Sequence, residues 1–249
     1  MRPCCTKRDF YLHSLTRNQG DLLPRPHVLL SVATSVDGYI DDTSPVRLLL
    51  SNADDFDRVD QVRAESDAIL IGAGTIRADN PRLLVNSDER RANRIARGLP
   101  EYPLKVTISG SGDLDPEAKF WHHGGEKVAY TTAAGVEKLR TRLDGLADVV
   151  SLGDDIDFGK LLDDLGERGI KRLMVEGGGS IHTAFLSQGL ADEIHLAIAP
   201  LVVGDSEAPR FLHPAAYPGG SSHRMTLAEA RTIGDVVLLR YLPKQESSK

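Results

Sequence analysis

The chain has 249 residues, of which 41% are hydrophobic, and its 30 Lys and Arg against 36 Asp and Glu give a formal net charge of −6. This length can bury a sizeable core as one large domain. An acidic protein repels polyanions, so a nucleic-acid partner or an anionic membrane surface is disfavoured and a small-molecule partner is expected.

The ends of the chain are expected to lie outside the main domain. Residues 1–25 are basic but contain no apolar stretch of the kind found in signal peptides, and Pro24-Arg25-Pro26 closes this segment. We therefore predict an N-terminal extension over 1–25, a single domain over 26–244 and a short tail over 245–249. Cys4 and Cys5 are adjacent, a spacing that suits neither a disulfide nor a metal site, and no run approaches the roughly 20 apolar residues of a membrane span. A reduced, cytoplasmic protein is expected.

Apolar β-branched runs alternate with segments of helical period from His27 onward, which predicts an α/β fold with a mostly parallel sheet. The predicted strands are 27–35, 67–73, 104–109, 127–132, 149–152 and 171–176, and the predicted helices are 53–65, 136–143, 158–168 and 177–190. After Leu190 the alternation stops, so 193–200 and 236–241 are predicted as antiparallel edge strands.

Two helical segments carry further expectations. The helix at 53–65 should be capped by Ser51 or Asn52 and should place Phe56, Val59 and Val62 on a stripe that faces the core. The segment 87–99 contains four arginines, and a solvated helix or loop is the preferred interpretation over an anion-binding site.

A glycine-rich turn, Gly177-Gly178-Gly179-Ser180, follows a predicted strand and opens a helix. Such a turn lets the backbone and the positive end of the helix dipole approach a phosphate closely. A purely structural turn remains an alternative. The acidic Glu176 favours a site, because a carboxylate at a strand end needs a polar partner or ligand.

A second glycine turn, Gly72-Ala73-Gly74-Thr75, differs from the dinucleotide fingerprint because Arg77 replaces its third glycine. It runs on to Asp79, which is expected on a loop before Pro81, and a structural role for this aspartate stays open. A third strand end carries Ser35-Val36-Asp37-Gly38, where the simple interpretation is a tight turn with Gly38 at positive φ. Parallel strands bring such ends into one crevice, which predicts a ligand site there.

Hydrolytic and metal chemistry find no support in the sequence. It contains neither a G-x-S-x-G nor an H-E-x-x-H motif. The adjacent His122 and His123 would point in different directions on a regular element, so no metal site is predicted.

Several of these motifs together resemble a known family. They are Ala33-Thr-Ser-Val-Asp-Gly38, Arg63-Ala-Glu-Ser-Asp-Ala-Ile-Leu-Ile-Gly-Ala-Gly-Thr75, Ala78-Asp-Asn-Pro-Arg-Leu83, Val175-Glu-Gly-Gly-Gly179 and Gly189-Leu-Ala-Asp-Glu193 with Ala199-Pro200 and Gly204. The set is similar to the RibD C-terminal family, the pyrimidine reductases of riboflavin biosynthesis. The resemblance implies a dihydrofolate-reductase-like fold, a homodimer, and NADPH-dependent hydride transfer to C1′ of a ribosylamino-pyrimidine 5′-phosphate.

The same resemblance implies a set of site residues. Cofactor binding would fall to Gly74, Thr75, Gly178, Gly179 and Ser180, with Ser109 and Thr131 on the adenosine side. Substrate binding would fall to Ser35, Asp37, Ser51, Arg63, Asp79, Leu83 and Glu176, and Asp79 and Glu176 are the expected catalytic residues. The source of the proton, a carboxyl group or water, stays open.

The chain departs from the family pattern at three positions. Many members carry a lysine where Ser31 stands, a tryptophan where Leu49 stands and an arginine where Asn86 stands. The lost basic groups would remove charge-assisted hydrogen bonds to a phosphorylated substrate. Two alternatives therefore stay open, namely reduction of another heterocycle such as dihydrofolate and a non-catalytic nucleotide-binding module.

Overall fold

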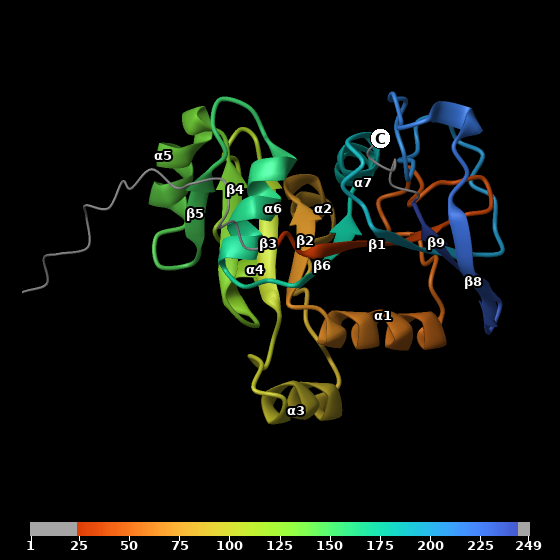
Figure 1. The fold of residues 1–249 in the computed structure, drawn as a ribbon, viewed down its shortest axis with the longest axis horizontal. Helices are drawn as coiled ribbons and strands as arrows, with labels where there is room; N and C mark the ends of the chain where they lie inside the picture. Colours follow the sequence, from red (N-terminus) through yellow and green to blue (C-terminus); the bar gives the residue numbers. More distant parts are fainter. Residues whose placement is uncertain (1–23, 244–249) are drawn as a thin grey trace, which may run out of the picture.

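The computed structural model describes residues 24–243, and its centre is a nine-stranded sheet with strand order β5-β4-β3-β2-β6-β1-β7-β9-β8 (Figure 1). The strands are β1 (His27–Thr34), β2 (Ala68–Gly72), β3 (Leu104–Ser109), β4 (Lys127–Thr131), β5 (Asp148–Ser151), β6 (Arg172–Gly177), β7 (Glu193–Ile198), β8 (Thr226–Ile233) and β9 (Val236–Leu242). The helices are α1 (Ala53–Glu65), α2 (Ala73–Asp79), α3 (Asp88–Ala96), α4 (Lys119–His122), α5 (Ala133–Arg142), α6 (Phe158–Glu167), α7 (Gly179–Ser187) and the 3-10 turn η1 (Gly220–Ser222).

The predicted α/β class, the parallel strands up to β6 and the antiparallel pairing of β9 are confirmed. The prediction of antiparallel edge strands was wrong for 193–200, because β7 also pairs in parallel with β1, and neither β7 nor β9 lies at the edge of the sheet. Strands β1 to β7 pair in parallel, whereas β9 pairs antiparallel with both β7 and β8. Strand β8 was missing from the sequence prediction. It is the outermost strand and is exposed over most of its length, so it lacks the apolar alternation by which a half-buried strand is recognised.

The two faces of the sheet bury separate apolar clusters. Helices α6 and α7 cover one face, where Phe158 and Phe185 meet edge to face with ring centroids 5.2 Å apart. Helices α1, α2, α4 and α5 cover the other face, with Trp121 and Leu139 among the buried residues. Because helices cover both faces, the central parallel strands are apolar throughout, as their sequences indicate.

Helix α1 confirms one expectation and corrects another. Asn52 is its N-cap, and its side chain accepts a hydrogen bond from the Asp55 backbone N–H, which settles the choice between Ser51 and Asn52. Val62 is buried and Val59 packs beside it, but Phe56 is 47% exposed. The prediction of a three-residue core stripe was therefore wrong at Phe56, since only the later turns of α1 lie against the apolar sheet.

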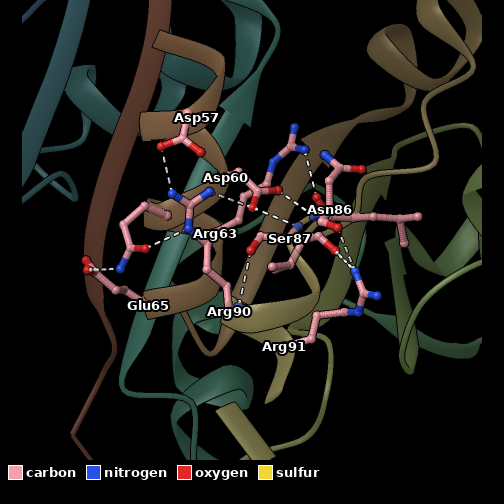
Figure 2. Close-up of polar contacts among 11 residues, drawn as sticks. Asp57, Asp60, Arg63, Glu65, Asn86, Ser87, Arg90 and Arg91 are labelled. Carbon is pink, nitrogen blue, oxygen red and sulfur yellow. Dashed lines mark hydrogen bonds and ion pairs between the residues drawn. The ribbon is translucent and has the colours of Figure 1, made fainter. Parts of the chain in front are cut away.

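The arginine-rich segment is a helix, α3, and it is not simply solvated. The Arg94 guanidinium is buried and donates to the carbonyl oxygens of Ala64 and Ser66. Arg90 pairs with Asp57 and Asp60 on α1 (Figure 2). The segment therefore fixes the chain between α2 and α3 against α1, which sequence periodicity alone did not predict.

The predicted ends of the chain fall largely outside the described residues. This holds for 1–23 of the expected extension and for the whole of the expected tail, 245–249. Arg25, near the end of the extension, pairs with Asp163 on α6 at 2.6 Å. Among the helices of residues 24–243, none has the length and apolarity required to cross a bilayer.

Candidate active site

The carboxyl ends of β2 and β6 lie side by side and bring the two glycine turns together. Ile71 is in register with Gly177, with an irregularity in the pairing just before them. A Cβ atom added to Gly177 would lie 2.9 Å from the Thr75 hydroxyl oxygen. Gly177 therefore packs directly against the Thr75 side chain, and this close contact holds the two turns together.

The turn before α7 is built from backbone alone. Gly178 has a φ of 88°, and a Cβ on Gly179 would lie 2.2 Å from the Arg210 carbonyl oxygen. Helix α7 has no side-chain cap at its N-terminus, and Ser180 is exposed there. The free N–H groups and the helix dipole at this end fit a pyrophosphate. In the neighbouring turn Gly74 is exposed, with open space where its Cβ would lie.

The expected adenosine side lies at the ends of β3 and β4. Ser109 and Thr131 are in register, and both side chains are buried. The Ser109 hydroxyl accepts a hydrogen bond from the Asp113 N–H. The Thr131 hydroxyl has no hydrogen-bond partner among the described residues and points toward the Cα of Gly135, whose added Cβ would lie 2.3 Å away.

On the other side of the glycine turns, Glu176 forms a bidentate ion pair with Arg63. The Nε–Oε1 and Nη2–Oε2 distances are both 2.6 Å, and the two side chains are only 19% and 13% exposed. Arg63 also donates to the Leu84 carbonyl oxygen at 2.9 Å. The buried Leu83 turns the chain toward that contact with a φ of 51°, a conformation uncommon for leucine.

Asp79 was expected on a loop, and this was wrong, because it is the last residue of α2. The left-handed conformation of Asn80, with φ 42°, ends the helix one residue before the proline. Burial raises the pKa of Asp79, Arg47 opposes this rise, and Asp41 adds to it. The Arg47 guanidinium is 3.8 Å from the carboxylate and is itself 63% exposed. Asp79 is thus a carboxyl group that holds its proton more strongly than an ordinary aspartate.

Asp37 is engaged within the protein. Its carboxylate accepts hydrogen bonds from the Ser35 hydroxyl at 2.6 Å and from the N–H groups of Val203 and Gly204. The Ser35 hydrogen bond is the main cause that lowers the Asp37 pKa. Gly38 has the expected positive φ, 86°. Ser35 and Asp37 therefore hold the segment after β7 in place, and substrate contact by either remains a prediction, as it does for the half-buried Ser51.

A segment at 209–213 lies over the α7 turn and was not found from the sequence. Arg210 stacks on the Tyr39 ring at 4.1 Å, and His213 comes within 3.5 Å of the Ser180 hydroxyl. Arg47 was also not found from the sequence. All three lie in irregular segments, where spacing gives no indication of which side chain returns to the site.

The three departures from the family pattern have distinct environments. Ser31 is buried within β1, in register with His195. Leu49 is 69% exposed. Asn86 is exposed, and its N–H donates to Asp60 (Figure 2). No cation therefore stands at the first or third position, and no group of three or more His, Cys, Asp or Glu residues in 24–243 is arranged to hold a metal ion.

Comparison with known proteins decides the family. The model of the RibD C-terminal domain matches residues 26–239. The chain belongs to the RibD C-terminal domain family. Among its relatives, the 2,5-diamino-6-ribosylamino-4(3H)-pyrimidinone 5′-phosphate reductase of Archaeoglobus fulgidus is 38% identical over 74% of this chain and 85% of that protein. The enzyme of the same name from Methanothermobacter thermautotrophicus is 29% identical over 88% and 99%.

Solved structures of RibD-type proteins share the fold. Acinetobacter baumannii RibD superposes with a TM-score of 0.73 at 23% identity, over 89% of this chain, which spans only 59% of that protein. A pyrimidine reductase-like protein of Corynebacterium diphtheriae gives the same TM-score and identity over 89% and 93%. The dihydrofolate-reductase-like RibD fold that the sequence motifs implied is thereby confirmed.

Proposed function

We propose that this RibD-family protein reduces a ribosylamino-pyrimidine 5′-phosphate of riboflavin biosynthesis with NADPH. The observation that carries the proposal is the placement of the Gly177–Ser180 turn next to Glu176, with its Arg63 partner, and Thr75. A helix end suited to a phosphate and an ion pair suited to a polar substrate thus lie at the same edge of the sheet, which is the arrangement that reduction by a bound nucleotide requires.

The pyrimidine ring is the 2,5-diamino-4(3H)-pyrimidinone in this proposal. The relatives that the chain matches over 85% and 99% of their length carry that name. Against the RibD protein of Chlamydia pneumoniae, identity is 28% and the chain spans 51% of the longer protein. The 5-amino-uracil analogue, 5-amino-6-(5-phosphoribosylamino)uracil, is therefore the second substrate to test.

In this proposal the residues of the chain bind the coenzyme, orient the substrate and supply a proton to it. NADPH, when bound, supplies the hydride that reduces C1′ of the ring-opened ribosylamine. Gly74, Thr75, Gly178, Gly179 and Ser180 would hold the coenzyme. Gly74 and Ser180 are exposed, whereas the Arg210 carbonyl oxygen covers Gly179.

The two proposed catalytic carboxyl groups, those of Glu176 and Asp79, have different roles. Both Glu176 oxygens accept hydrogen bonds from Arg63, which fixes the direction of the carboxylate, so Glu176 orients the ribose hydroxyl groups. Asp79 keeps its proton to a higher pH than a solvated aspartate and delivers it to the imine nitrogen bonded to C1′ as that carbon receives the hydride. The hydride and this proton together complete the reduction of the C=N bond.

Ser31 and Asn86 stand where many family members carry a lysine and an arginine, so another cation is needed to bind the substrate phosphate. Arg47 is the candidate, because it lies in the segment before Ser51 and its ion pair with Asp79 is long, at 3.8 Å. Its side chain is exposed and can swing to a phosphate at little cost.

A homodimer is proposed from the exposed end of the sheet. The β8–β9 hairpin is the sheet edge, and Leu227, Val237 and Leu242 expose between 38% and 52% of their surface there, next to Met225. An open edge with apolar side chains is a surface that proteins usually cover. Sedimentation velocity should give twice the mass of the chain, and a monomer at micromolar concentration would reject this part of the proposal.

The test of function is turnover of defined substrates by the purified full-length protein. NADPH oxidation is followed with the diaminopyrimidinone ribosylamine phosphate, with its 5-amino-uracil analogue and with dihydrofolate, and the ribityl product is identified by mass spectrometry. Turnover is expected with the first substrate. Turnover of dihydrofolate alone, or tight NADPH binding without oxidation on any substrate, would overturn the proposal.

A further inference from the structure

A buried lysine outside the candidate active site binds three backbone carbonyl groups. Lys105 of β3 is only 1% exposed. Its ammonium nitrogen donates to the carbonyl oxygens of Arg82 at 2.8 Å, of His123 at 3.0 Å and of Phe120, and it lies 4.3 Å from the centroid of the Phe120 ring. None of the ion pairs in residues 24–243 involves Lys105. A lysine is rarely buried without a carboxylate, so these carbonyl groups are what holds its charge in the core.

The three carbonyl groups come from two segments that are far apart in the sequence. Phe120 lies in the short helix α4 and His123 directly follows it, whereas Arg82 lies in the irregular segment after α2, defined here as segment 81–86. An ammonium group at the carboxyl end of a helix binds carbonyl oxygens that have no partner within the helix. Lys105 therefore joins the end of α4 to segment 81–86.

Segment 81–86 depends on charged side chains for its position. Within residues 24–243, no backbone group of this segment forms a hydrogen bond to another backbone group. Its carbonyl oxygens accept from Lys105, Arg63 and Arg91, and the Asn86 N–H donates to Asp60 (Figure 2). The loss of one of these side chains therefore leaves part of the segment with nothing in the backbone to hold it.

The segment connects the residues on the proposed substrate side. Asp79 lies two residues before it, and Leu83, an expected substrate contact with a φ of 51°, lies within it. Lys105 binds the carbonyl group before Leu83, at Arg82, and Arg63 binds the one after it, at Leu84. The two cations thus fix the backbone on both sides of a residue whose conformation is uncommon for leucine.

We infer that Lys105 is a positioning residue for the proposed reaction, whose charge holds segment 81–86 so that Leu83 keeps its place beside the substrate. The inference rests on the proposed function for the reaction concerned. It adds a residue that touches neither substrate nor coenzyme and acts through the Arg82 carbonyl group.

The protonation state of Lys105 gives the inference a readout. Burial and, to a smaller extent, Lys127, in register with it on β4, lower the pKa of Lys105 to about 7. The groups that face it from segment 81–86 and from α4 with residue 123 are the three carbonyl oxygens and the Phe120 ring. The ammonium form has three donors for the three oxygens, whereas the neutral amine has two and no charge. The hold on the segment should therefore weaken as the pH rises through 7, and an arginine at this position should keep it.

The direct test is limited proteolysis of the full-length protein by trypsin at the peptide bond after Arg82. The Arg82 side chain is exposed while its backbone is held, so the cleavage rate follows the fraction of molecules in which the segment is released. The rate is divided by that of cleavage after Arg140, an exposed arginine on α5, which cancels the pH dependence of trypsin. At pH 6, Lys105→Met should raise this ratio at least about tenfold, as expected when hydrogen bonds from a charged group are lost. Lys119→Met, which removes the same charge from an exposed position on α4, should leave the ratio unchanged.

A pH series decides the question even if Lys105→Met fails to fold, which circular dichroism melts would reveal. Between pH 6 and pH 8.5 the cleavage ratio of the wild-type protein should rise by at least about threefold, because Lys105 loses its proton in this range. The ratio of Lys105→Arg should stay constant. A wild-type ratio that does not rise, an equal rise in Lys105→Arg, or a folded Lys105→Met with the wild-type ratio overturns the inference.

Kinetics separate this inference from the proposed function. Lys105→Met should raise the KM for the pyrimidine substrate at least about tenfold, Lys105→Arg should restore it, and the Kd for NADPH should be the same in both variants and the wild type. An unchanged KM in Lys105→Met would overturn the positioning role. Pyrimidine turnover with cleavage ratios that do not respond to position 105 would reject the inference and keep the function. Responsive ratios without turnover of any pyrimidine would reject the function while confirming that Lys105 holds the segment.

Discussion

Arg63 and Glu176 hold each other through two parallel hydrogen bonds of 2.6 Å, and the third contact of Arg63 fixes the Leu84 carbonyl oxygen. One guanidinium thus ties the end of β6, the end of α1 and the segment after α2 into one unit. A fork that donates to both carboxylate oxygens sets the direction of the carboxylate as well as its charge.

Replacing either member of this pair should therefore reduce activity more than binding. Arg63→Lys keeps the charge but loses the fork, and Glu176→Gln loses the charge, so each should lower kcat by about tenfold or more. Each should also destabilise the fold by about 1.5–3 kcal/mol, the usual range for hydrogen bonds to charged groups. Steady-state kinetics and chemical denaturation measure the two effects. Unchanged kcat in Glu176→Gln would rule out its catalytic role.

Asp79 should give the pH profile of a proton donor. Because burial raises its pKa, the protonated form persists above the pH at which an ordinary aspartate ionises, and the rate should fall as the pH rises through that raised pKa. Asp79→Asn should remove this alkaline limb and lower kcat by about 10² to 10⁴, the usual contribution of a general acid. If the limb persisted in Asp79→Asn, another group would be the donor.

Two glycine substitutions should separate packing from coenzyme approach. A Cβ at Gly74 meets nothing within 4 Å, so Gly74→Ala should keep the stability of the fold or raise it by about 0.5 kcal/mol, while it weakens coenzyme binding. A Cβ at Gly179 would lie 2.2 Å from a backbone oxygen, so Gly179→Ala should cost about 1–3 kcal/mol of stability. Thermal melts measure the stability of the two variants, and the KM for NADPH measures their coenzyme binding. If Gly74→Ala bound NADPH normally, the coenzyme would not approach this turn.

Arg47 should matter for the phosphate of the substrate and little for the fold. Arg47→Ala removes an exposed cation with one long ion pair, so stability should change by less than about 1 kcal/mol. The KM for the phosphorylated substrate should rise by about tenfold or more, while the KM for its dephosphorylated form stays the same. Arg82→Ala, an exposed arginine on the neighbouring segment, serves as the matched control. Equal effects on both substrate forms would assign Arg47 another role.

The parallel strands and most helices were predictable because burial on both faces leaves continuous apolar runs, as in β2, where all five residues are buried. Strand β8 and the exposure of Phe56 could not be predicted. An exposed strand shows no alternation of apolar and polar residues, and Phe56 keeps the three-residue spacing of the apolar stripe although its side chain faces solvent. Arg94 was assigned to solvent because its buried acceptors are backbone oxygens of Ala64 and Ser66, which carry no sequence signal.

The glycine turns and Glu176 could be found from sequence because parallel strand ends share one edge. The partners that give these residues their chemistry could not. Arg47 lies near Asp79 and His213 lies near Ser180, and both come from irregular segments. Such contacts follow from tertiary packing and leave no periodic trace in the chain.

His182 predicts how stability should depend on pH. It is buried on α7 with its ring 5.2 Å from that of Phe211, and burial lowers its pKa from 6.5 to about 4. Since the unfolded chain binds the proton more readily, stability should be complete above about pH 6.5 and decline as the pH falls toward 4, by a total of about 3 kcal/mol. In His182→Phe this decline should shrink by that amount, whatever the pH-independent effect of the larger ring. Urea denaturation at a series of pH values measures it, and parallel pH curves for the two proteins would show that His182 is not the group responsible.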